Sequence, residues 1–183
     1  MTERRIVMFT RKQHLFSVIA ITNLPEVPGK ETKQCFNGPR YWPHESVFDQ
    51  FLPANQPKAT ACTISALAPS KFVTFIEWAR TILDVSADTP FEILGKSLKE
   101  HGHIMTLPQV EYVIEALEQA LYSGMNKVNY FFVENENGDV SVGCIFLEVR
   151  RWYTRLYQFG RHDCLVTDHN LLVRNLDASK LDL

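Results

Sequence analysis

The sequence predicts an α+β fold in which an N-terminal β-hairpin and an antiparallel C-terminal sheet flank three central helices, with the helices packed on one face. Two patterns predict this class. Runs rich in β-branched and aromatic residues occupy both ends of the chain. Between them, three segments show helical apolar spacing, and each has a proline at or near its start. With 183 residues, the chain is long enough to form a single domain, residues 1–183, around one core.

The N-terminal hairpin is expected from residues 4–9 and 15–22, which a polar turn at 11–14 would join. A long loop, residues 23–58, follows the hairpin. It holds six of the nine prolines, so regular structure is expected only in one short helix near 45–51. Its five aromatic residues predict an ordered loop, which serves either as a surface wrap or as a binding segment.

A third strand and three helices are expected in the middle of the chain. Each helix has a recognisable start, in which a Ser or Thr that can cap the backbone stands beside a proline or a Gln or Glu. The expected segments are a strand at 59–67, a helix at 71–84 capped by Ser70, a helix opened by a capping box at 89–92 and ending near 100, and a helix opened at 106–109 and ending near 122.

The third helix has two distinct sides. Apolar residues form one stripe, whereas Glu111, Glu115 and Glu118 lie on the opposite side. We interpret these glutamates as a solvated face, and recognition of a basic partner is the alternative.

The C-terminal part of the chain is rich in strand signals. Two strands, 127–134 and 140–149, flank a hairpin turn at 135–139 that contains an Asn-Gly step. The run 146–159 is rich in Trp, Tyr, Thr and Phe, which favours a strand. It is expected either as one long bent strand with the preceding segment or as two strands with an unusual turn near Arg150 and Arg151, and its apolar spacing also fits a helix. A last strand or hairpin is expected within 163–174.

Composition and charge limit the classes of function. The net charge is −2, which does not favour nucleic-acid binding by bulk charge. The charge is uneven, with net +4 over residues 1–44, −8 over 45–148 and +2 over 149–183. The four cysteines show no CxxC spacing, and no apolar run is long enough to cross a bilayer, so reduced thiols, no membrane contact and a cytoplasmic location are expected.

The strongest candidate for a binding site is a run of arginines and aromatic residues near the C-terminus. No acidic residue interrupts it between Glu148 and Asp163. In a strand, alternate side chains from Arg151 to Phe159 share one face, where guanidinium and aromatic groups could bind a protein or an anionic ligand. A ladder that only stabilises the sheet is the alternative. The candidate residues are Arg150, Arg151, Tyr153, Arg155, Tyr157, Phe159, Arg161 and His162.

Signatures of catalysis and of metal binding are weak. The sequence has no Gly-rich phosphate loop, no HExxH and no GxSxG, and no cofactor is expected. His162, Cys164 and His169 lie close together, but their spacing matches no common zinc site, so no metal is expected. A metal-independent ribonuclease that uses Arg155, Tyr157 and His162 is chemically conceivable.

The sequence therefore favours a small soluble binding module without enzymatic activity, which acts through a protein–protein interface. A nucleic-acid-binding protein that uses the Arg/Tyr-rich strand is the first alternative, and the ribonuclease is the second. The sequence leaves the oligomeric state open.

Overall fold

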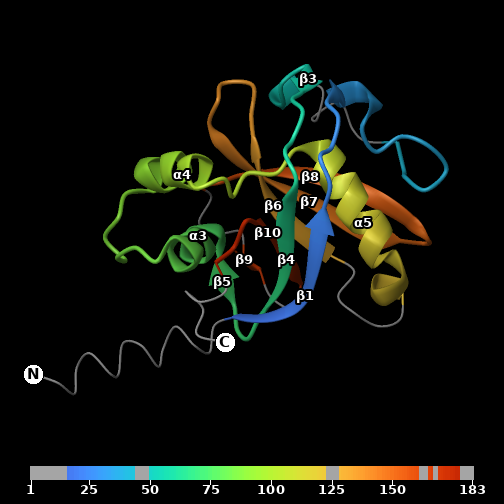
Figure 1. Ribbon diagram of the computed structural model, residues 1–183. Helices are drawn as coiled ribbons and strands as arrows, with labels where there is room; N and C mark the ends of the chain where they lie inside the picture. Colours follow the sequence, from blue (N-terminus) through green and yellow to red (C-terminus); the bar gives the residue numbers. More distant parts are fainter. Residues whose placement is uncertain (1–15, 44–49, 123–127, 161–164, 167–168, 178–183) are drawn as a thin grey trace, which may run out of the picture.

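The computed structural model describes residues 16–43, 50–122, 128–160, 165–166 and 169–177. Its class is α+β, as predicted (Figure 1). No helix in these ranges is long and apolar enough to cross a membrane. The elements are β1 (Phe16–Leu24), β2 (Lys30–Glu31), η1 (Thr32–Gln34), β3 (Asn55–Gln56), β4 (Cys62–Pro69), β5 (Val73–Thr74), α3 (Phe75–Leu83), α4 (Phe91–Glu100), α5 (Leu107–Tyr122), β6 (Val128–Glu134), β7 (Val140–Glu148), β8 (Arg151–Gln158), β9 (Leu165–Val166) and β10 (Asn170–Arg174).

The main sheet has six strands in the order β1-β4-β10-β6-β7-β8. It joins both β-rich ends of the chain because β10 lies between β4 and β6. The prediction of an antiparallel sheet is wrong at one pair, since β10 runs parallel to β6. β1 pairs with β4, and its predicted hairpin partner, 4–9, lies outside the described residues.

The sequence predicts that all the helices pack on one face of the sheet. In the structure they divide between its two faces. Tyr130 and Phe132 of β6 belong to a core cluster with α3 and α4. Phe131 and Val133 belong to a second cluster with α5. Figure 1 shows α3 and α4 on the left and α5 in front of the sheet on the right. Five consecutive residues of β6 are buried, as expected of a strand that is covered on both faces.

The helix starts agree only in part with their predicted caps. Thr106 and Gln109 form the expected capping box, because each side chain bonds the other residue's backbone N–H. The helix expected at 71–84 with Ser70 as its cap begins instead at Phe75, where Thr74 and Glu77 of a Thr-x-x-Glu motif form a capping box. At α4 the predicted box is wrong, since Pro90 is the N-cap and no side chain caps the helix.

The long loop, described except for 44–49, is tied to α5 by two of the three glutamates that were expected to be solvated, Glu111 and Glu118. The Glu111 carboxylate accepts a hydrogen bond from the Phe36 N–H at 2.6 Å and pairs with Lys30 at 2.5 Å. Glu118 pairs with Arg40 at 2.9 Å. The acidic stripe therefore holds the loop against the domain. The helix expected near 45–51 falls largely outside the described residues.

Candidate binding surface

The run of arginines and aromatic residues forms strand β8 at one edge of the sheet, so the helical alternative is wrong. Its side chains alternate as expected for a strand. Arg151 and Arg155 are exposed, whereas Trp152 and Thr154 point to the opposite face and are buried. The odd-numbered residues of β8 lie on the face of the sheet that packs against α3 and α4, and the part of β8 near Tyr157 and Phe159 lies against these helices.

The far end of this odd-numbered row lies in the core. The ring of Tyr157 lies 5.9 Å from that of Phe75 of α3, and Phe159 is buried edge-on against Phe132 at 5.7 Å. These two members of the candidate set therefore contribute packing beneath α3. Arg161 and His162 lie outside the described residues.

The near end carries a ladder of stacked side chains, which we call the cation–aromatic ladder: Trp42, Phe146, Arg151, Tyr153 and Arg155. Tyr153 stacks on Phe146, its cross-strand partner, at 5.4 Å with an interplanar angle of 15°. The Arg155 guanidinium lies 5.1 Å from the centre of the Phe146 ring. The guanidinium carbon of Arg151 lies 4.8 Å from the centre of the Trp42 ring. The centre of that ring is 6.0 Å from the centre of the Tyr153 ring. Sequence reasoning missed Trp42 and Phe146.

Trp42 reaches the ladder from the long loop. The segment 40–42 runs parallel to β8: the Trp42 N–H donates to the Trp152 carbonyl at 2.9 Å, and the Trp152 N–H donates to the Arg40 carbonyl at 3.0 Å. The indole N–H of Trp42 donates to the carbonyl of Glu148 at 3.1 Å. This segment covers part of the β8 edge, which would otherwise expose unpaired backbone groups. An aromatic residue in a proline-rich loop was the only signal in the sequence.

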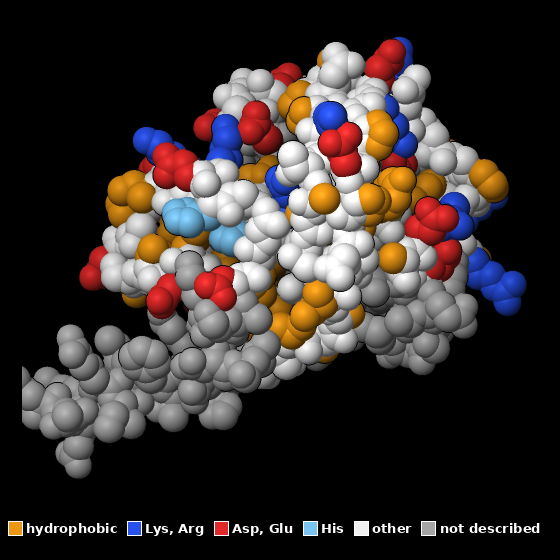
Figure 2. All heavy atoms as spheres, in the orientation of Figure 1, with side chains coloured by type: hydrophobic (Ala, Val, Ile, Leu, Met, Phe, Trp, Pro, Cys, Tyr) orange, Lys and Arg blue, Asp and Glu red, His pale blue; other side chains and the backbone are white. Residues whose placement is uncertain are grey.

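The β7–β8 hairpin ends in a two-residue turn, Val149–Arg150, closed by the pair Glu148 and Arg151. Both turn residues have positive φ angles, 45° and 62°, which is the conformation of a type I′ turn. Val149 is 82% exposed. Basic side chains project at the right edge of Figure 2, where Figure 1 places this hairpin tip.

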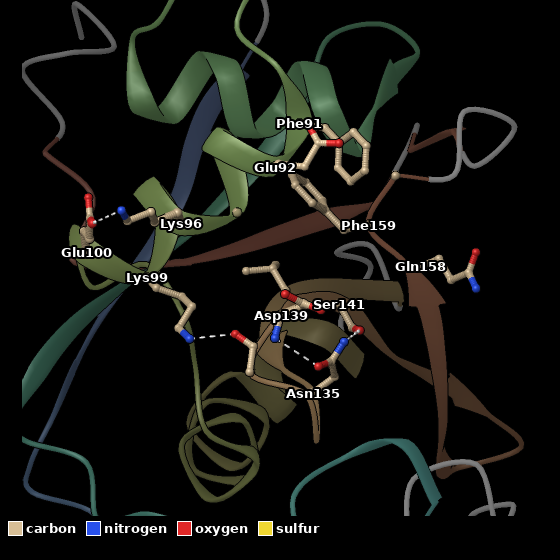
Figure 3. Close-up of a pocket in the computed structure, with 14 residues that line it drawn as sticks. Phe91, Glu92, Lys96, Lys99, Glu100, Asn135, Asp139, Ser141, Gln158 and Phe159 are labelled. Atoms are coloured by element: carbon tan, nitrogen blue, oxygen red, sulfur yellow. Dashed lines mark hydrogen bonds and ion pairs between the residues drawn. The ribbon is translucent and has the colours of Figure 1, made fainter.

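A groove of about 890 Å³ lies elsewhere, between α4 and the β6–β7 hairpin (Figure 3). Phe91 and Phe159 form its apolar wall. Polar groups on the other side are engaged with neighbouring protein groups, because Lys99 donates to the Gly138 carbonyl at 2.6 Å and the amide of Asn135 donates to Ser141 at 3.4 Å. The groove therefore offers shape, but two of its polar side chains, Lys99 and Asn135, already bond within the protein.

The two buried thiols, those of Cys35 and Cys144, are poor candidates for a reactive nucleophile. Burial raises the pKa of Cys144 to about 12 against the lowering effects of Arg155 and Tyr130. Burial, reinforced by the charge of Glu111, raises the pKa of Cys35 to about 12. A thiol with so high a pKa stays protonated at neutral pH. Within the described ranges no cluster of three His, Cys, Asp or Glu side chains could hold a metal. His162 and Cys164, which were considered as zinc ligands, lie outside the described residues.

No known family model, curated protein or solved structure matches this chain. Function is therefore inferred from the chemistry of the surface itself. Of the features described, the cation–aromatic ladder with the adjoining turn is the one that combines exposed cations, aromatic rings and an exposed apolar side chain.

Proposed function

We propose that this chain is a non-enzymatic binding module that contacts a protein partner through the cation–aromatic ladder and the Val149–Arg150 turn. The observation that carries the proposal is the gathering of Trp, Tyr, Phe and Arg at one edge of the sheet, held in place by mutual stacking. Trp, Tyr and Arg dominate the energetics of protein interfaces, and a surface that is already ordered loses less entropy when it binds.

The charge of this surface indicates an acidic partner. Among the described residues of this surface, Arg150, Arg151 and Arg155 are exposed, and Glu148 next to the turn is an exposed carboxylate. Arg40 is neutralised by its ion pair with Glu118. Counted over its described residues, the surface therefore carries more positive than negative side chains, although the chain as a whole has a net charge of −2. Such a patch favours encounter with an acidic surface and disfavours basic ones.

A protein fits this surface better than a nucleic acid does because of the way the rings are arranged. Proteins that bind single strands leave aromatic faces open for bases to stack on. Here Tyr153 covers one face of Phe146, and the guanidinium of Arg155 also lies over that ring. Arg151 lies over the ring of Trp42. On the ring faces that these neighbours cover, a base could stack on Phe146 or Trp42 only by displacing Tyr153, Arg155 or Arg151.

The proposal can be tested with a library of random peptides displayed on phage and selected on the wild-type protein. Selected peptides are expected to combine Asp or Glu with a large apolar residue. Their affinity should fall at least about tenfold for Arg151→Glu, because charge reversal replaces attraction with repulsion at a hot spot. The matched control is Lys71→Glu, which makes the same change of charge at an exposed lysine between β4 and β5.

Two results would overturn the proposal. One is a selection that enriches no peptide, and the other is a set of peptides that bind Arg151→Glu as tightly as wild type. Single-stranded and duplex oligonucleotides at two salt concentrations provide a parallel arm. Salt-sensitive binding that Arg151→Glu abolishes and Lys71→Glu does not would favour the nucleic-acid alternative. Cleavage of labelled RNA that His162→Ala abolishes would favour the ribonuclease.

A further inference from the structure

The two hairpins of the main sheet end in turns of contrasting chemistry. The β6–β7 turn uses residues suited to its conformation: Gly138 takes the positive φ angle of 81°. The Asn135 side chain accepts hydrogen bonds from the N–H groups of Asn137 and Asp139, both at 3.0 Å. The β7–β8 turn instead places Val149 and Arg150 at positive φ angles. Type I′ turns strongly favour Asn-Gly at these two positions.

Val149 is poorly suited to its backbone conformation. A β-branched residue with a positive φ angle is a genuine outlier, because its Cβ substituents crowd the backbone. Burial does not compensate for the strain, since Val149 is 82% exposed. Neither turn propensity nor core packing explains a valine here. Residues held in strained conformations concentrate at sites of function.

We infer that the Val149–Arg150 turn is the docking tip of the binding surface and enters an apolar socket on the protein partner, with carboxylates at the rim of that socket. This inference rests on the proposed function and specifies the chemistry of the partner. Val149 supplies the apolar contact at the end of the hairpin. Arg150 within the turn and Arg151 beside it supply two guanidinium groups, which pair with carboxylates in bidentate geometry.

The structure around the turn supports this role. The closing pair of Glu148 and Arg151 is the first of an unbroken series of residue pairs between β7 and β8, and this pairing holds the tip in place. Trp42 ties the same end of the hairpin to the long loop through its bond to the Glu148 carbonyl. A tip that is ordered before binding loses little conformational entropy on docking. Only two residues form the turn, so the tip is narrow enough for a socket.

The decisive variant is the double substitution of Val149→Asn with Arg150→Gly, which installs the preferred type I′ pair. Relief of strain should raise the midpoint of thermal unfolding by at least about 2 °C. Loss of the apolar and cationic groups should weaken binding of the peptides selected on wild type at least about tenfold. Stability and affinity thus change in opposite directions, which a purely structural role for the turn would not produce.

Two single variants provide matched controls. Val149→Thr keeps the β-branched shape but replaces a methyl group by a hydroxyl, so affinity should fall while the melting temperature stays close to that of wild type. Val149→Ile keeps the apolar contact and should retain binding.

The outcomes separate this inference from the proposed function. If peptides lose affinity for Arg151→Glu but bind Val149→Thr and the Asn-Gly variant as wild type, the surface stands and the docking tip is refuted. An Asn-Gly variant that melts at or below the wild-type temperature also overturns the inference, because the turn is then not strained. If no peptide binds, the proposed function fails, and the inference fails with it.

Discussion

Gly143 of β7 lies directly opposite Phe131 of β6, and the ring of Phe131 occupies the space above the glycine. A Cβ atom at position 143 would lie 2.3 Å from two ring carbons of Phe131 and 3.0 Å from a third. Carbon atoms in favourable contact are about 3.5–4.0 Å apart. The substitution Gly143→Ala therefore requires the ring to move by more than about 1 Å.

The ring has little room for this movement. Phe131 is fully buried in the core cluster beneath α5. Inserting atoms into a packed core costs about 1–3 kcal/mol, and a collision with an aromatic ring at this distance belongs near the upper end. Alanine recovers about 0.5–1 kcal/mol relative to glycine through its lower backbone entropy. The net loss of unfolding free energy should be about 2 kcal/mol, equivalent to a fall in melting temperature of about 4–8 °C.

Urea denaturation of wild type and Gly143→Ala measures this difference. The matched control is Gly95→Ala in α4, where the nearest atom to a new Cβ is a methyl carbon of Val140 at 3.6 Å, an ordinary contact. Alanine should stabilise that helix by about 0.8–1 kcal/mol. The two variants of identical chemistry should therefore shift stability in opposite directions. A Gly143→Ala protein as stable as wild type would refute the packing argument.

Three further substitutions or conditions test other parts of the structure. Burial raises the pKa of Cys35 and of Cys144 from 9.0 to about 12, so these thiols ionise at lower pH in the unfolded protein than in the folded one. Their contribution to the free energy of unfolding should be complete below pH 9.0 and should decline as the pH rises toward 12. Urea denaturation midpoints measured over that pH range check this. Thr74→Ala removes a capping box from α3 and should cost about 1 kcal/mol in the same assay. Glu111→Gln keeps an oxygen that can accept from the Phe36 N–H but removes the charge that pairs with Lys30, so it should cost about 1 kcal/mol. A loss that high salt does not reduce would show that the ion pair with Lys30 contributes nothing.

The local structure of this protein follows from its sequence wherever the determining interactions lie within a few residues. The Asn-Gly step at 137–138 terminates a hairpin, and Thr106 with Gln109 opens α5, because turn and cap chemistry acts over three or four positions. The alternation in 151–158 correctly predicts a strand with Arg151 and Arg155 exposed. Those residues are the part of the candidate surface that the sequence could identify.

Long-range packing decided the rest. Whether α5 covers the same face as α3 and α4 depends on which side chains of β6 each helix buries. Because five consecutive residues of β6 are buried, its sequence pattern does not show which face a given helix covers. The parallel insertion of β10 between β4 and β6 is equally non-local. Trp42 and Phe146 join the ladder only because the loop runs beside β8 and the strands pair in register. Periodicity reports which side chains share a face, and only the burial of distant segments against one another determines what covers that face.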